Sequence, residues 1–95
     1  MAKVNKTLLL NHLRKYRKAR NLSQRDVARI LGFADPSSLS HWEQGVRLPS
    51  ATNLFRLAAL YRTLVDALYI DTLRRIREEV KKQEADRLPR ADHVA

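Results

Sequence analysis

The feature that most constrains the fold is a series of helix start and stop signals along the middle of the chain. Ser23 and Asp26 have the spacing of a capping box, in which each side chain bonds the backbone N–H of the other residue. Gly32 and Gly45, the two glycines of the sequence, suit helix C-termini. Ser50 follows a proline and can cap a further helix. Because the segments between these signals are short, they predict a bundle of short helices.

Apolar spacing and capping residues predict five helices and no strand. The expected helices cover residues 8–19, the segment from Ser23 to Gly32, about 36–44, the segment from Ser50 to Tyr61, and a last one that begins near Val65 or Asp66 and passes Lys82. Asn21 is a plausible stop for the first helix, and Asp35 is expected to cap the third with Pro36 at its first position. The expected apolar faces contain Leu9, Leu13, Tyr16, Val27, Ala28, Ile30, Leu31, Leu39, Trp42, Leu54, Leu57, Ala58 and Tyr61.

Positive charge is concentrated at the start of the chain. The formal net charge is +9, and the first 20 residues hold seven basic residues, Lys3 and Lys6 among them, and no acidic residue. Such a surface favours a polyanion, which can be nucleic acid, an anionic membrane or an acidic protein, although solubility alone also explains charge. No apolar run approaches the roughly 20 residues that span a bilayer, and no signal-peptide cleavage site follows the first leucines.

Catalytic and metal-binding chemistry has no visible basis in the sequence. The chain lacks cysteine, which excludes disulfides and thiolate metal sites and suits the cytoplasm. His12, His41 and His93 are far apart in the sequence, and no acidic cluster has ligand spacing. We therefore expect no catalytic residue, no metal site and no cofactor.

The single tryptophan lies in a polar stretch, SSLSHWEQG. At helical spacing, Leu39, Trp42 and Glu43 lie on one side of this segment, so that Trp42 and Leu39 can anchor it to a core. The other side carries Ser37, Ser40, His41 and Gln44. Because this side lacks the lysines and glutamates that usually cover a solvated helix, it is typical of a surface that contacts a partner.

The stretches LSQRDVARILGF and LSHWEQGVRLPS together resemble the Xre family, the helix-turn-helix domains of the phage lambda Cro and repressor type. The resemblance covers about residues 9–68, and it rests on Ser23-Gln24, Ala28, Gly32, Leu39, Trp42-Glu43, Gly45 and Pro49-Ser50. The segment FADPSS makes the turn one residue longer than is usual in the family. The resemblance implies an all-α, lambda-repressor-like bundle of about five helices, here with an extended C-terminal helix.

The resemblance also implies roles for individual residues, since the recognition helix of this family enters the major groove of DNA. The implied base-reading residues are Ser37, Ser40 and His41. The implied backbone contacts are Gln24, Gln44 and Arg47, together with the basic residues Arg14, Lys15 and Lys18. The implied structural ion pair joins Arg17 to Glu43. For each base-reading or backbone residue, the alternative is an ordinary solvated position on a helix.

Apolar residues at spacings of 4, 3 and 4 predict a homodimer seam on the last helix. They are Tyr69, Leu73, Ile76 and Val80. The alternative is that this helix folds back onto the first and fourth helices. We expect a helix-turn-helix domain over residues 1–63, the dimerisation helix over 64–88 and a frayed tail over 89–95.

The sequence as a whole predicts a sequence-specific DNA-binding transcriptional regulator. We expect a cytoplasmic repressor that binds double-stranded operator DNA as a homodimer. The alternative is an antitoxin that binds a partner toxin and represses its own operon. A basic helix lying on a membrane is a weaker interpretation, because the apolar face of the first helix is needed for the core.

Overall fold

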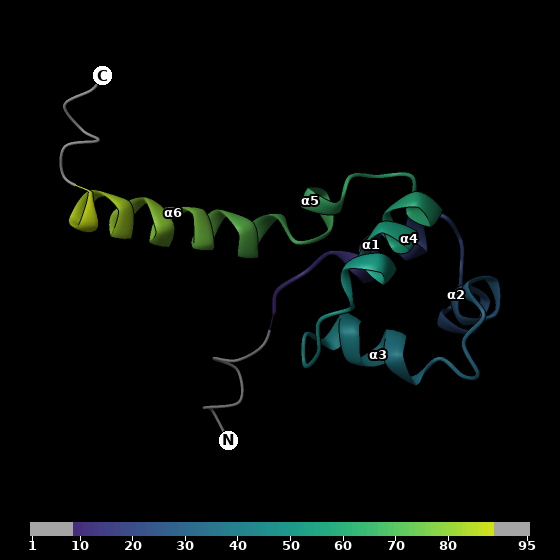
Figure 1. The fold of residues 1–95 in the computed structure, drawn as a ribbon. Helices are drawn as coiled ribbons and strands as arrows, with labels where there is room; N and C mark the ends of the chain where they lie inside the picture. The colour runs from purple at the N-terminus through teal and green to yellow at the C-terminus, as the bar shows by residue number, and fades with distance from the viewer. Residues whose placement is uncertain (1–8, 89–95) are drawn as a thin grey trace.

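The computed structural model describes residues 9–88, and these residues form helices and no strand. The helices are α1 (Leu13–Ala19), α2 (Gln24–Leu31), α3 (Ser37–Gln44), α4 (Ala51–Tyr61), α5 (Val65–Leu68) and α6 (Ile70–Arg87). Figure 1 shows α1 to α5 gathered into one packed unit, from which α6 projects away. The expected all-α fold is confirmed. Lys3, Lys6, His93 and the tail over 89–95 lie outside the described residues.

The capping signals of the sequence determine where α2 and α3 begin and end. Ser23 Oγ accepts a hydrogen bond from the N–H of Asp26, and Asp26 accepts one from the N–H of Ser23, so the predicted capping box is confirmed. Gly32 and Gly45 both adopt left-handed conformations, with φ of 81° and 82°. A Cβ at Gly45 would also lie 2.6 Å from the carbonyl oxygen of Leu9, which excludes larger residues there.

The core forms where the first five helices meet. Its fully buried side chains are Leu13, Val27, Leu39, Leu57 and Leu68, and its other members are Ala28, Trp42, Ala58, Tyr61 and Tyr69. Leu9, Tyr16, Leu31 and Leu54 pack against it while partly exposed. Because Leu68 has no exposed surface, α5 belongs to the packed unit, and the unit extends beyond the boundary expected at residue 63.

The first helix begins at Leu13, and the helix predicted from residue 8 was wrong in its first turn. The N–H of Leu9 donates to the carbonyl of Gly45 at 2.8 Å, and the N–H of His12 donates to that of Leu68 at 2.8 Å. Asn11 Nδ2 donates to the carbonyl of Trp42 at 2.9 Å. These long-range bonds use the donors of residues 9–12 to tie the segment to α3 and α5, so the segment does not continue α1.

Other predictions need smaller corrections. Ile30 was expected in the core but is 55% exposed, because none of the helices within residues 9–88 covers that side of α2. The third helix begins at Ser37, one residue later than expected, with Pro36 preceding it. The last helix is interrupted at Tyr69, whose φ of −130° separates α5 from α6. Folding of α6 back onto α1 and α4 is contradicted, since residues 74–88 are exposed along their whole length.

Candidate nucleic-acid interface

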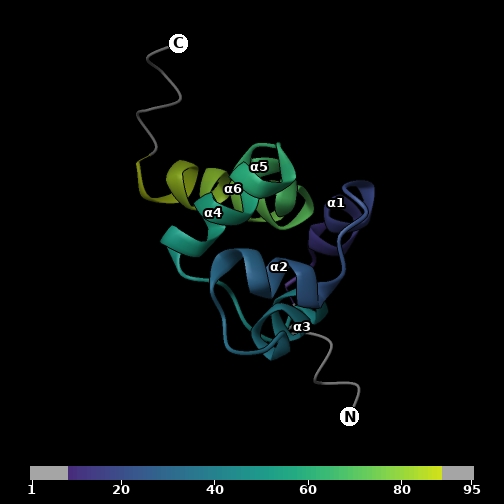
Figure 2. The same ribbon diagram turned by 90° about the vertical axis from the view of Figure 1, so that its right-hand side faces the viewer.

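The helix α3 presents one buried and one accessible side. Leu39 and Trp42 are 1% and 7% exposed, and the Trp42 ring meets the Phe33 ring edge to face, with centroids 5.8 Å apart. On the other side, Ser37 and Gln44 are exposed, and Ser40 and His41 are half-buried. Figure 2 shows α3 at the edge of the packed unit, beside α2. The polar side chains predicted to read DNA therefore lie together on one open face.

A buried ion pair fixes α3 against α1. Arg17 Nε donates to Glu43 Oε2 at 2.6 Å, Arg17 Nη2 donates to Glu43 Oε1 at 3.1 Å, and the two side chains are 9% and 6% exposed. The hydrogen bond to Glu43 raises the pKa of Arg17 above its ordinary value, so the guanidinium stays charged. Gln24 Nε2 also donates to Glu43 Oε1, at 3.1 Å, and this bond ties the N-terminus of α2 to the same ion pair. The carboxylate of Glu43 is thus neutralised and satisfied inside the fold.

A hollow of about 320 Å³ lies where α1, α2 and α3 meet. Its lining residues are Arg14, Arg17, Gln24, Ser40, Glu43 and Gln44. Gln44 Nε2 donates to Ser40 Oγ at 3.0 Å, which orients both polar side chains along its rim. Because Arg17 is paired with Glu43, the exposed Arg14 supplies the free positive charge. Donors and one cation around an open hollow are the chemistry that accepts a phosphate group.

The remaining predicted backbone contacts do not line this hollow but are exposed on α1 and in the loop after α3. Lys15 and Lys18 are exposed on α1, where Lys15 Nζ lies 5.9 Å from the centroid of the Tyr16 ring. Arg47 is exposed in the loop that follows α3. All three charges face solvent near the helices that frame α3, so they remain available to a polyanion.

Ser37 has a second task at the start of α3. Its N–H donates to Asp35 Oδ1 at 2.8 Å, and its hydroxyl also bonds this oxygen. These bonds lower the pKa of Asp35 below its ordinary value. The N-cap position of α3 is Pro36 and not Asp35 as expected, but the Asp35 side chain still accepts bonds from Ser37, whose hydroxyl is partly engaged there.

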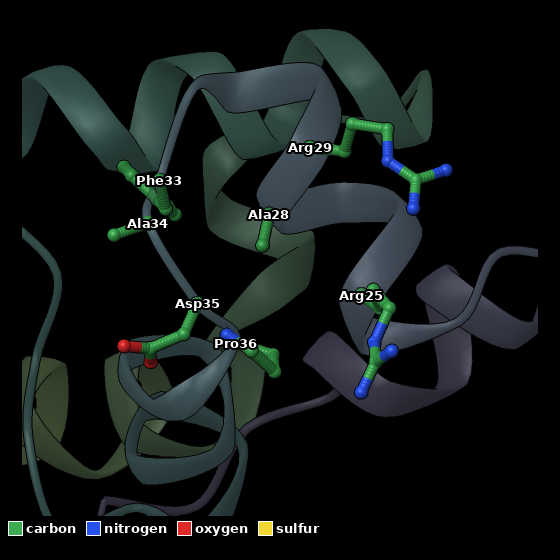
Figure 3. A pocket seen from close by; sticks show the side chains of 7 residues that line it. All are labelled: Arg25, Ala28, Arg29, Phe33, Ala34, Asp35 and Pro36. Atoms are coloured by element: carbon green, nitrogen blue, oxygen red, sulfur yellow. The ribbon is translucent and has the colours of Figure 1, made fainter.

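A larger hollow, of about 440 Å³, lies between α2 and the turn that leads to α3, and the sequence did not predict it. In Figure 3, Arg25 and Arg29 extend from α2 on one side, and Phe33, Ala34, Asp35 and Pro36 of the long turn line the other. Both arginines are exposed, and the sequence alone indicates only two ordinary solvated charges. Their spacing of four residues, combined with the long FADPSS turn, is the only signal that predicts a shared hollow.

The residues of the predicted dimer seam are divided between the core and the surface. Tyr69 is 9% exposed and belongs to the core, and its buried hydroxyl has no hydrogen-bond partner among the described residues. Leu73 is half-buried. Ile76 and Val80 are 42% and 51% exposed. Tyr69 therefore offers little surface to a second chain, although it lines a surface hollow together with Leu73 and Ile76.

Other kinds of site find little support within residues 9–88. Over this range, no group of three or more His, Asp or Glu side chains is close enough to hold a metal ion. No helix of this range is long and apolar enough to cross a membrane.

Comparison with known proteins gives one match. The model of the helix-turn-helix family matches residues 13–68, which run from the start of α1 to the end of α5. The chain matches no curated protein and no solved structure. The matched segment contains α1, α2 and α3, the three helices that frame the hollow beside α3.

Proposed function

The chain belongs to the helix-turn-helix family of DNA-binding transcription regulators, and from this premise we propose that it is a sequence-specific repressor that binds operator DNA as a homodimer. In this proposal α3 is the recognition helix and enters the major groove. In the cytoplasm, the dimer binds within a promoter and thereby represses transcription. The chain acts as a binding protein and not as an enzyme.

The observation that carries the proposal is the convergence of donors on the accessible side of α3. Ser40 and Gln44 share the hollow with Arg14 of α1 and Gln24 of α2. A helix in the major groove needs phosphate contacts on its flanks to fix its depth and register, and side chains along its face to read bases. In this proposal the hollow provides the phosphate contacts, and Ser40 and His41 provide the side chains that read bases.

Each base-reading residue has a specific chemistry. The ring N–H of His41 can donate to the N7 and O6 acceptors of guanine. The hydroxyl of Ser40 can donate or accept and therefore suits several bases. Ser37 is positioned one turn earlier, with its hydroxyl shared with Asp35. The base preference at the Ser37 position is consequently the weakest of the three.

Phosphate contacts surround these residues in the proposed complex. Arg14, Lys15 and Lys18 approach the backbone from α1, Gln24 from the start of α2, and Gln44 and Arg47 from the end of α3 and its loop. Pairing of Glu43 with Arg17 supports this arrangement, because it neutralises the carboxylate that lines the hollow.

Selection of binding sites from random duplex DNA by the full chain tests the proposal. We expect enrichment of an inverted repeat whose half-sites are centred about 34 Å apart or a multiple of that. The matched control carries Ser40→Ala and His41→Ala, which keep the buried side of α3, and it should enrich no comparable site. Recovery of unselected sequence by the parent chain would contradict the proposal.

A second candidate function is that of an antitoxin that binds a toxin and represses its own operon. The exposed apolar side chains Ile76 and Val80 on the projecting α6 favour it, because such a surface suits a protein partner. Co-expression with the product of an adjacent gene tests this candidate. Relief of that product's growth arrest by the full chain, but not by a chain with Ile76→Asp and Val80→Asp, is the expected result.

A further inference from the structure

The projecting helix α6 carries an exposed apolar strip, which the charged Glu84 interrupts between Val80 and Leu88. Ile76, Val80 and Leu88 are 42%, 51% and 53% exposed. A hollow of about 340 Å³ runs along this strip, and a second one of about 250 Å³ lies at its foot against Leu48 and Leu54. Leu73 and Ile76 line both hollows, so the two form one groove. Figure 1 shows the later turns of α6 standing clear of the packed unit.

The charged wall of this groove contains both signs at a fixed spacing. Arg77 and Glu84 line the hollow along α6, together with Val80 and Lys81. The two residues are seven positions apart, so they share one flank of the helix but are separated by roughly 10 Å along its axis. They are too far apart to pair within one chain. A second α6 running in the opposite direction can bring each of them to the opposite charge.

We propose that this groove is occupied by α6 of a second copy of the chain, packed antiparallel with a two-fold axis between Val80 and Lys81. In this register Arg77 of each chain faces Glu84 of its partner, and Val80 packs beside its own counterpart. Leu73 of each chain faces Leu88 of the partner, which covers the hollow at the foot of α6. The inference rests on the homodimer of the proposed function and specifies its interface.

Self-complementarity is what a two-fold contact requires, because the same surface must serve both partners. The groove contains two cations, Arg77 and Lys81, one anion, Glu84, and apolar residues, and Arg77 and Glu84 lie at equal distances on either side of a centre near Val80. The segment of α6 from Leu73 to Leu88 has its middle between Val80 and Lys81, which coincides with that centre. The antiparallel arrangement also places the two packed units at opposite ends of the helix pair, where they do not collide.

A parallel arrangement fits the charges less well. In a parallel pair, the flanking residue before one apolar position faces the residue five positions later on the partner helix. Glu79 would then face Glu84 of the partner, and like charges at that position weaken pairing. The antiparallel register replaces this repulsion with two Arg77–Glu84 attractions per dimer.

Thiol cross-linking distinguishes the two arrangements directly, because the sequence contains no native cysteine. Full-length chains with Leu73→Cys and with Leu88→Cys are treated with a short bismaleimide linker, separately and as an equimolar mixture. The expected result is a cross-linked dimer in the mixture and little in either variant alone. Cross-linking of Leu73→Cys to itself would overturn the register in favour of a parallel pair. The absence of any cross-linked dimer would show that a second copy of the chain does not occupy the groove.

Charge exchange gives an independent test by sedimentation of the full chain. Arg77→Glu and Glu84→Arg should each weaken the dimer by about tenfold, and the double exchange should restore it. The matched control exchanges Arg75 and Glu78, which are exposed but do not line the groove, and it should leave the dimer unchanged. A dimer strengthened by Glu84→Arg alone would overturn the register.

The outcomes also separate this inference from the proposed function. Binding of the charge variants to a short duplex with a single half-site depends on α3 and should remain unchanged. If cross-linking and charge exchange behave as expected while the parent chain selects no DNA sequence, the interface stands and the proposed function fails. If the parent chain selects an inverted repeat while both dimer tests fail, the DNA-binding proposal stands and this interface is wrong.

Discussion

Arg17 and Glu43 join α1 to α3 through two hydrogen bonds of 2.6 and 3.1 Å, with both side chains more than nine-tenths buried. Gln24 adds a third bond to the same carboxylate, from the start of α2. Three helices therefore meet at one buried charge pair, directly beneath the hollow that lies beside the accessible side of α3. The pair positions α3 and at the same time neutralises an acidic charge that lines this hollow.

Glu43→Ala should destabilise the domain by roughly 3 kcal/mol, because it leaves the Arg17 guanidinium buried without its anion. The free energy of unfolding, measured by chemical denaturation, checks this value. The matched control is the double variant Arg17→Leu and Glu43→Leu, which removes both charges and should lose much less stability. A single variant as stable as the parent would show that solvent reaches Arg17 in solution.

Trp42→Ala should destabilise the domain by roughly 3–5 kcal/mol, the usual cost of removing a buried aromatic side chain. The ring is 7% exposed and packs edge to face on Phe33, so the substitution leaves a cavity between α3 and the core. Thermal unfolding followed by circular dichroism measures the loss. Ser38→Ala, on the exposed first turn of α3, is the control and should change stability by no more than about 0.5 kcal/mol. Parent-like melting of the Trp42 variant would place the ring outside the core.

Tyr69→Phe should stabilise the domain by roughly 1 kcal/mol at neutral pH, because it removes a buried hydroxyl that has no hydrogen-bond partner among the described residues. Burial also raises the pKa of Tyr69 from 10.0 to about 12. A raised pKa means that the folded state favours the protonated form. This contribution is complete below pH 10 and is lost as the pH rises toward 12.

The free energy of unfolding of parent and Tyr69→Phe chains, measured between pH 8 and pH 11.5, checks both effects. The variant should lose less stability than the parent over the upper part of this range. Tyr61, whose pKa burial also raises, remains in both chains and accounts for a shared loss. Equal losses in the two chains would indicate that the Tyr69 hydroxyl is hydrated in solution.

Local signals were the part of the fold that the sequence predicted well. The capping box of Ser23 and Asp26, the left-handed Gly32 and Gly45, and the cap at Ser50 depend on residues within one turn of each other. Their geometry is determined by the nearby backbone, so a single sequence contains the necessary information. The left-handed Asn21 after α1 belongs to the same class.

Features that depend on distant partners were not predictable in the same way. Residues 9–12 have helical apolar spacing but bond to Gly45, Trp42 and Leu68, which lie more than 30 residues away. The interruption at Tyr69 arises from burial of α5 against the core and has no glycine or proline to mark it. Ile30 continues the apolar pattern of α2, yet its exposure depends on which elements happen to cover that side.

The candidate site shows the same division. Sequence patterns assigned Ser40, His41 and Gln44 to the accessible side of α3, and they lie there. The resemblance named Arg17 and Glu43 as a pair, and the two side chains are bonded. The hollow between Arg25, Arg29 and the long turn was missed, because its shape depends on how the four residues 33–36 fold back beside α2.

Arg47→Ala should weaken binding to specific and unrelated duplexes by a similar factor, because a phosphate contact carries no sequence information. The slope of log affinity against log salt concentration should fall in magnitude by about 1. Arg75→Ala is the control, since it removes one exposed charge from α6 and should leave the slope unchanged. A change confined to the specific duplex would assign Arg47 to base reading.

The central claim is that the accessible side of α3 reads base sequence, and His41 is its most informative residue. The most direct measurement is the ratio of affinities for the selected site and for an unrelated duplex of equal length, at one salt concentration. The parent chain should show a ratio of at least about 10³. His41→Ala should lower that ratio by a factor equivalent to roughly 1–3 kcal/mol, with little change for the unrelated duplex. A parent ratio near one, or equal losses on both duplexes in the variant, would contradict the account.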